Sequence, residues 1–142
     1  MADLKITTSQ APAVRAMIQS DAGELFDYES DLATAAELAE QGITAAPVSY
    51  TIFKSSNAFA QYAFASENLT PVTGYNNIEI DPEDAFYTPS AVEELGLNYN
   101  FSFIPASRST QPFSETGFYL IKFMIYPKEG AAVAFQLTIQ VI

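Results

Sequence analysis

The clearest alternation of hydrophobic and polar positions lies at the end of the chain. Over residues 133–141 the apolar positions recur every second residue, at Val133, Phe135, Leu137, Ile139 and Val141. A period of two predicts a strand with one buried face. Residues 118–126 are apolar on both faces except at Lys122, which predicts a central strand covered on both sides. Turn residues at 127–130 complete a predicted hairpin, which needs further sheet to be stable in water.

Shorter patterns predict the remaining elements. Strands are expected at residues 4–9, 13–19, 47–54, 70–73, 76–80 and 97–104, with a weaker candidate at 58–66. Ser30 is predicted to cap a helix over 31–41 that ends at Gly42. Helical turns are expected near 82–95, where Ser90 and Glu93 have the spacing of a capping box. Short strands with turns every ~8–12 residues are typical of an antiparallel sandwich or barrel rather than of βαβ units.

Length and composition fit one β domain over residues 1–142, with 1–45 as an N-terminal extension integrated into it. The chain has 142 residues, 49% of them hydrophobic, including 11 Phe and 8 Tyr, so it can bury a substantial core. The N-terminus has the pattern of a strand and no basic or apolar leader, and no apolar run reaches the ~18 residues of a membrane span. We therefore expect synthesis in the cytoplasm without a signal peptide.

The absence of two residue types removes much chemistry. The chain has neither Cys nor His, which excludes disulfides, thiol catalysis, a histidine-based triad and histidine metal ligands, and no cofactor is expected. The net charge is −11 with only 6 Lys and Arg. Such a charge repels nucleic acid and anionic membranes, so neither is expected as a partner. Solubility of an aromatic-rich β protein also accounts for the charge.

Residues 112–121, PFSETGFYLI, resemble the approach to the penultimate strand of immunoglobulin-like modules of the PKD and fibronectin kind. In that family a tyrosine hydroxyl bonds back to the preceding corner, and Gly117 and Tyr119 match its spacing. The resemblance implies an all-β, antiparallel immunoglobulin-like sandwich, with its strand order open. Small sandwiches of this kind are found in tailed-phage virions, which implies a decoration or assembly component incorporated in a virion.

Acidic residues are the main candidates for acid–base or metal chemistry. Asp81, Glu83 and Asp84 surround Pro82, where a calcium site and a solvated turn are both compatible with the sequence. Glu93 and Glu94 could form a glycosidase pair with Glu115 or Asp84, but no pattern in the sequence fixes a partner.

The aromatic residues are more numerous than one core requires. The candidates for an exposed contact surface are Phe59, Tyr62, Phe64, Tyr75, Phe86 and Tyr87. Core packing is the alternative explanation for all six. Tyr and Phe with few Lys are typical of interface cores, and the alanines between 58 and 65 would permit close approach of a second chain.

These patterns favour a non-enzymatic structural or interaction protein. The expected partners are proteins, either a second copy of the chain or capsid and tail components. The alternative is a carbohydrate-binding β-sandwich module, with glycan as the ligand. A carboxylate-based hydrolase is a third hypothesis.

Overall fold

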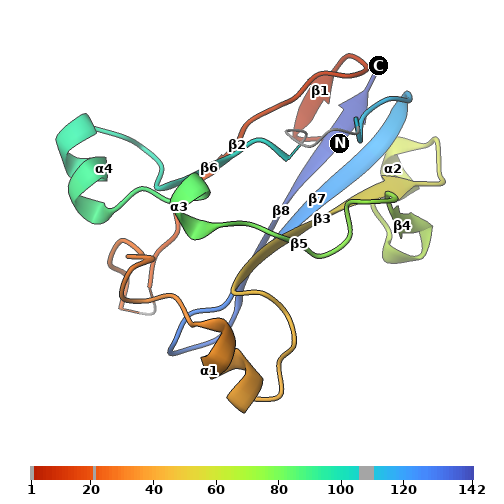
Figure 1. The fold of residues 1–142 in the computed structure, drawn as a ribbon. Helices are drawn as coiled ribbons and strands as arrows, with labels where there is room; N and C mark the ends of the chain where they lie inside the picture. Colours follow the sequence, from red (N-terminus) through yellow and green to blue (C-terminus); the bar gives the residue numbers. More distant parts are fainter. Residues whose placement is uncertain (1, 21, 106–110) are drawn as a thin grey trace.

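The computed structural model describes residues 2–20, 22–105 and 111–142, which form a β-rich fold with short helices. Figure 1 shows its long strands running together through the molecule. The strands are β1 (Leu4–Ile6), β2 (Val14–Ala16), β3 (Val48–Ser55), β4 (Leu69–Pro71), β5 (Ile78–Glu79), β6 (Phe101–Phe103), β7 (Gly117–Ile125) and β8 (Val133–Val141). The helices are α1 (Ala35–Glu40), α2 (Ala60–Ala63), η1 (Ser66–Asn68), α3 (Pro82–Ala85) and α4 (Pro89–Leu95).

The predicted C-terminal hairpin is confirmed and lies within the main sheet. β7 and β8 pair antiparallel along their whole length, from Gly117 opposite Val141 to Ile125 opposite Val133. β3 pairs antiparallel with the other edge of β7, so β7 is a central strand, as its apolar sequence predicts. The strand order is β1-β8-β7-β3-β4, and β5 also pairs with β3.

One pairing in this sheet departs from the antiparallel prediction. β1 lies parallel to β8, with Leu4 opposite Ile139 and Ile6 opposite Val141. Parallel neighbours need a long connection, and nearly the whole chain separates these two strands. Asp3 also fixes the register, because its carboxylate accepts hydrogen bonds from the backbone N–H and the hydroxyl of Thr138, both at 3.0 Å.

A second, two-stranded sheet is formed by β2 and β6 (Figure 1). Its strands are shorter than the predicted 13–19 and 97–104. Asn100 immediately precedes β6, and its side chain is buried in the core. The amide is fully buried, accepts from the Ile18 N–H at 2.7 Å and donates to the Ile18 carbonyl at 2.8 Å. Asn100 therefore takes the place of a backbone partner beyond the end of β2.

The core lies on the face of the main sheet that carries Tyr50, Ile52, Ile121 and Phe123, all of them buried. Residues directly opposite in the ladder share a face, so the register of β3 and β7 brings Tyr50 beside Phe123 and Ile52 beside Ile121. Phe101 of β6 packs edge to face on Phe123, with ring centroids 5.3 Å apart. This contact joins the small sheet to the large one.

Three local predictions differ from the structure. The helix predicted over 31–41 begins at Ala35, because Thr34 and Glu37 form the capping box there. The capping box predicted at Ser90 is absent, since Thr88 caps α4 and Pro89 occupies its first position. Residues 58–66, predicted as a weak strand, form α2 and the start of η1. Alanine favours helix and is depleted in strands, and four of those nine residues are alanine.

Candidate interaction surface

The most exposed aromatic side chains lie on and beside α2. Phe59 is 69% exposed and Tyr62 is 56% exposed. The two residues are three apart on one helical turn, closed by a hydrogen bond from the Tyr62 N–H to the Phe59 carbonyl at 3.0 Å. Side chains at this spacing are neighbours on a helix surface. We call these two residues, with the exposed Ala58, Ala60 and Gln61, the α2 patch.

Contacts on the inner side of α2 hold it against the sheet. Ala63 is fully buried, and the half-buried Phe64 packs edge to face on Phe118 of β7 with ring centroids 5.7 Å apart. Phe64 is therefore an anchor of α2, whereas Phe59 and Tyr62 face solvent.

Two asparagine side chains fix the backbone under the exposed rings. The Asn57 side-chain oxygen accepts from the Phe59 N–H at 2.9 Å, and the Asn68 amide donates to the Tyr62 carbonyl at 2.8 Å. A four-residue helix is unstable by itself, so these bonds supply order that helix propensity cannot. The α2 patch is thus preorganised before any partner binds, which lowers the entropic cost of binding.

Two of the six predicted contact residues are placed in the core instead. Tyr75 is fully buried and Phe86 is 5% exposed. The Tyr75 backbone bonds to Ile52 of β3, and the Phe86 ring packs against Phe26 and Phe101. Neither residue can contribute to an exposed surface, so core packing is the correct interpretation for this pair.

Tyr87 belongs to a second exposed group, distant from α2. Its ring is 37% exposed and meets Tyr99 edge to face, at 5.8 Å and an interplanar angle of 74°. The Arg15 guanidinium lies 4.8 Å from the centre of the Tyr99 ring. A depression of about 420 Å³ beside this group is lined by Ala13, Arg15, Asp84, Ser102, Phe103 and Ile104. Sequence analysis missed Arg15 and Tyr99, because only the pairing of β2 with β6 brings them together.

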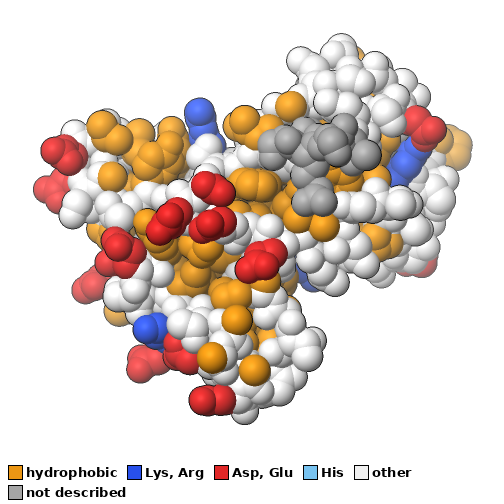
Figure 2. Space-filling model, viewed as in Figure 1, with side chains coloured by type: hydrophobic (Ala, Val, Ile, Leu, Met, Phe, Trp, Pro, Cys, Tyr) orange, Lys and Arg blue, Asp and Glu red, His pale blue; other side chains and the backbone are white. Residues whose placement is uncertain are grey.

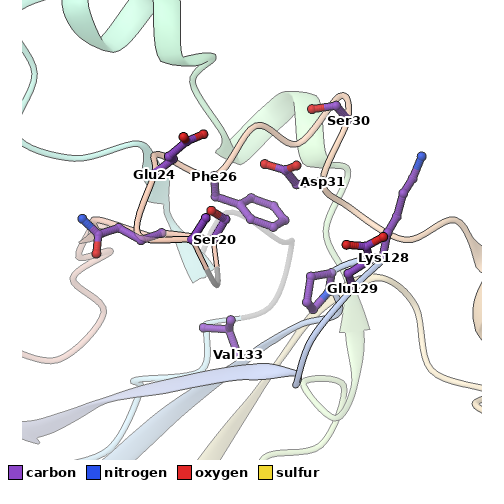
Figure 3. Close-up of a pocket in the computed structure, with 11 residues that line it drawn as sticks. Ser20, Glu24, Phe26, Ser30, Asp31, Lys128, Glu129 and Val133 are labelled. Carbon is purple, nitrogen blue, oxygen red and sulfur yellow. The ribbon is translucent and has the colours of Figure 1, made fainter.

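A larger cavity of about 440 Å³ lies where residues 19–31 meet the β7–β8 turn. Figure 3 shows Phe26 inside it, surrounded by the carboxylates of Glu24, Asp31 and Glu129, with the Lys128 side chain extending away. The Asp31 carboxylate accepts a hydrogen bond from the Asp27 N–H at 2.9 Å, so it stabilises the local turn. The acidic lining makes this cavity a solvated recess rather than an apolar ligand pocket.

The acidic residues predicted as candidates for acid–base or metal chemistry are exposed. The structure gives them local structural roles or places them far from one another. Asp81 caps α3 by accepting from the Glu83 N–H at 3.1 Å. Among the described residues, no group of three or more acidic side chains is placed to hold a metal ion. Glu93 and Glu94 lie on α4, at the opposite end of the molecule from Glu115, which precedes β7 (Figure 1). The structure therefore does not bring Glu93 or Glu94 together with Glu115.

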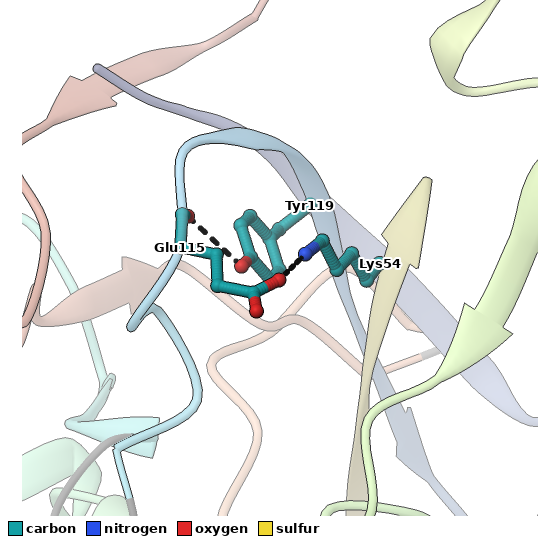
Figure 4. Close-up of polar contacts among 3 residues, drawn as sticks. All are labelled: Lys54, Glu115 and Tyr119. Atoms are coloured by element: carbon teal, nitrogen blue, oxygen red, sulfur yellow. Dashed lines mark hydrogen bonds and ion pairs between the residues drawn. The ribbon is translucent and has the colours of Figure 1, made fainter. Parts of the chain in front are cut away.

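The corner before β7 has the geometry predicted for Tyr119. Its hydroxyl donates to the Glu115 carbonyl at 3.0 Å, and Phe113 packs edge to face on its ring at 5.2 Å. Figure 4 shows the Lys54 ammonium joined to the Glu115 carboxylate beside this ring. The hydrogen bond and charge of Lys54 lower the pKa of Glu115, and the same hydrogen bond raises the pKa of Lys54.

Negative charge is concentrated away from α2. Six acidic residues lie within 24–40 and six more within 79–94, of 17 in the chain. Figure 2 shows acidic side chains gathered over the α1, α3 and α4 side, which we call the acidic end, interspersed with apolar ones. Burial together with the charges of Glu29, Glu83, Asp27 and Asp81 raises the pKa of Tyr28. By contrast, residues 41–66 contain no acid and a single cation, Lys54.

The sequence matches no family model, no curated protein and no solved structure in the comparisons made. None of the helices in the described ranges has the combined length and apolar character that crossing a bilayer requires.

Proposed function

We propose that this chain is a non-enzymatic structural module that acts through protein–protein contacts. The observation that carries the proposal is the preorganised α2 patch, where Asn57 and Asn68 hold the backbone of two exposed aromatic residues. Aromatic side chains on a rigid support are typical of the residues that dominate binding energy at interfaces. Phe59 is 69% exposed and Tyr62 is 56% exposed, so both rings are accessible to a partner.

The proposal includes an immunoglobulin-like sandwich of the kind found in tailed-phage virions. The hydrogen bond from Tyr119 to the Glu115 carbonyl supports it, because that fold uses a tyrosine at this corner. The main sheet with β2 and β6 against its core face is compatible with two layers. Decoration or assembly of a virion is the role that this resemblance favours, with capsid or tail proteins as partners.

Composition of purified particles tests the virion role. Phage particles would be purified from a lysate by density and analysed by quantitative mass spectrometry. We expect the chain in a fixed copy number relative to the major capsid protein, and resistant to a high-salt wash. Intact particles without the chain would contradict the virion role.

Carbohydrate binding is the second candidate, favoured by the exposed group of Tyr87, Tyr99 and Arg15 beside Asp84. The 74° angle between the two rings allows only one of them to stack on a given sugar face. A glycan array with the wild type and Tyr87→Ala tests it. Binding that is lost in the variant would replace the protein-contact proposal, and an array without signal would exclude the candidate for the glycans displayed.

A further inference from the structure

We infer that the α2 patch is a self-association surface, on which a second copy of this chain docks about a twofold axis. The inference rests on the proposed interaction role and names the partner. The structure supplies two independent arguments, one from the chemistry of the patch and one from the distribution of charge.

The patch is self-complementary. Phe59 and Tyr62 supply apolar ring surface, Gln61 and the Tyr62 hydroxyl supply hydrogen-bond donors and acceptors, and Ala58 and Ala60 permit close approach. In a twofold contact each copy presents the same surface, so a patch with both rings and small residues meets its own complement. Rings can pack against the alanine side of the partner's helix without leaving a buried charge.

Electrostatics selects this end of the molecule for contact between copies. Each copy has a net charge of −11, so two copies repel unless the contact keeps their acidic surfaces apart. α2 lies at the opposite end of the molecule from α3 and α4 (Figure 1). The nearest charged residues along the chain are Lys54, which is paired with Glu115, and Glu67. A dimer through α2 therefore directs the two acidic ends away from each other.

A partner of different chemistry is less well matched. A basic partner would be attracted to the acidic end rather than to α2, because that is where carboxylates are concentrated. An acidic partner would meet the same repulsion as a second copy but without a complementary patch. The uncharged α2 patch favours an uncharged counterpart, and the chain itself provides one.

Sedimentation velocity and equilibrium of the full chain test the inference, from about 1 µM to about 1 mM. We expect a reversible monomer–dimer equilibrium. Phe59→Ser and Tyr62→Ser are each expected to raise the dissociation constant at least about tenfold, the effect of losing a side chain that dominates an interface. Because both side chains are exposed in the monomer, we expect unchanged urea midpoints at concentrations where the wild type is monomeric, which shows that the variants fold.

Leu95→Ser is the matched control, because Leu95 is 64% exposed but lies on α4 at the acidic end. We expect it to leave the dissociation constant unchanged. Asn68→Ala retains both rings but removes the bond to the Tyr62 carbonyl, and we expect it to weaken the dimer to a smaller extent than Tyr62→Ser. Raising the salt from about 0.01 M to about 0.3 M should strengthen the dimer, because the repulsion between copies is screened.

The chain contains no cysteine, so single labels report on geometry without background. Spin labels at Ser66→Cys, just after α2, should give a short distance between copies, and labels at Ser90→Cys on α4 should lie beyond the measurable range. A monomer at the highest concentration, a dimer weakened by Leu95→Ser but not by the α2 variants, or a short distance at position 90 would each overturn the inference. None of these outcomes bears on the presence of the chain in virions, which the particle analysis tests separately.

Discussion

At the scale of single residues, Tyr119 fixes how the chain enters β7. Its ring is buried against Phe113, and its hydroxyl ties the corner four residues earlier to the strand. Tyr119→Phe retains the ring and removes only this hydrogen bond, so we expect the free energy of unfolding to fall by about 0.5–1.5 kcal/mol. Urea denaturation measures it, with Tyr87→Phe as the control because that ring is partly exposed. An equal effect in both variants would show that the bond to Glu115 contributes nothing.

Asn100 has a larger expected effect, because it satisfies both backbone polar groups of Ile18 inside the core. Asn100→Ala leaves the buried Ile18 N–H without a partner, whereas the Ile18 carbonyl still accepts a hydrogen bond from the Phe26 N–H at 3.1 Å. We expect a loss of about 1–3 kcal/mol in the free energy of unfolding, the cost of one unsatisfied group. Asn98→Ala, at an exposed position two residues earlier, should change it by less than about 0.5 kcal/mol. A small effect at Asn100 would mean that water replaces its amide.

The ion pair of Lys54 and Glu115 predicts a pH dependence. Lys54 lowers the pKa of Glu115, so the pair stabilises the fold above 4.5, the ordinary value, and this contribution is lost as pH falls through the lower folded pKa. The pKa of Lys54 is raised, so its contribution is present below 10.5 and is lost as pH rises through the higher folded pKa. The Glu115 side chain is 70% exposed, which keeps the stabilisation small and sensitive to salt.

Comparison of the wild type with Glu115→Gln measures this dependence. The variant retains the backbone carbonyl that Tyr119 contacts and removes only the charge. We expect a lower urea midpoint than wild type at pH 7, and a difference that shrinks as pH falls through the lowered folded pKa of Glu115. Glu67→Gln controls for a general change in net charge. A difference that stayed constant as pH fell would assign the effect to something other than the ion pair.

At the scale of elements, β1 depends on few contacts for its place at the sheet edge. It has three residues, and Asp3 reinforces its parallel pairing by four hydrogen bonds with Thr138, two from the Asp3 N–H and two to its carboxylate. Asp3→Ala removes the two carboxylate bonds. We expect faster hydrogen exchange at the amides of 4–6, with unchanged exchange in the β7–β8 hairpin, because edge elements open locally.

Asp84→Ala makes the same change of charge at an exposed site on α3 and should leave exchange in β1 unchanged. If exchange accelerated throughout the sheet in Asp3→Ala, β1 would be an integral part of the cooperative unit rather than a tethered edge.

The elements that the sequence predicts well are those in which one pattern dominates. The alternation from Val133 to Val141 and the apolar run in β7 predict the β7–β8 hairpin correctly. In this region the hydrophobic pattern and the turn residues between the strands indicate the same structure. The segment 58–66 is ambiguous, since alanine favours helix while Phe and Tyr favour strand. The bonds from Asn57 and Asn68 decide in favour of helix, and their partners follow only from the folded chain.

The same limit applies to the candidate surface. An aromatic residue in a polar context is compatible with burial and with exposure, and only packing distinguishes the two. Tyr75 lies between glycine and two asparagines, yet its ring enters the core beside Tyr50, with centroids 6.4 Å apart. Phe59 lies between two alanines and faces solvent. Sequence analysis could identify the aromatic excess but not which rings remain exposed.

At the scale of the whole molecule, the uneven distribution of charge is the main feature. Carboxylates of 24–40 and 79–94 gather at the acidic end, whereas the end with α2 has few charges (Figure 2). Such an arrangement makes the α2 end the part of the molecule where contact with another negatively charged copy would meet the least repulsion.

Crowded carboxylates also imply that repulsion lowers the stability of the fold. The pKa of Tyr28 is raised first by burial and then by the charges of Glu29 and three other carboxylates. We therefore expect the urea midpoint to rise with moderate salt, because screening weakens repulsion at distances beyond the Debye length of about 8 Å at 0.15 M. Glu29→Gln removes one charge and should raise the free energy of unfolding at low salt by at most about 0.5 kcal/mol.

Measuring the effect of salt on both the wild type and Glu29→Gln isolates the repulsion between Glu29 and its neighbouring carboxylates. The hydrogen bond described for Glu29 is donated by its backbone N–H to the Asp27 carboxylate at 3.1 Å, and Glu29→Gln retains it. The substitution should therefore weaken only the repulsion between Glu29 and the neighbouring carboxylates. The variant should therefore gain less stability from added salt than the wild type does.

Gln61→Glu provides the opposite change, because it adds a carboxylate to the α2 patch. No acidic residue lies within the sequence from 41 to 66. Gln61→Glu should leave the free energy of unfolding of the monomer unchanged. If added salt stabilised the wild type, Glu29→Gln and Gln61→Glu equally, the charges of the acidic end would be too well solvated to oppose folding.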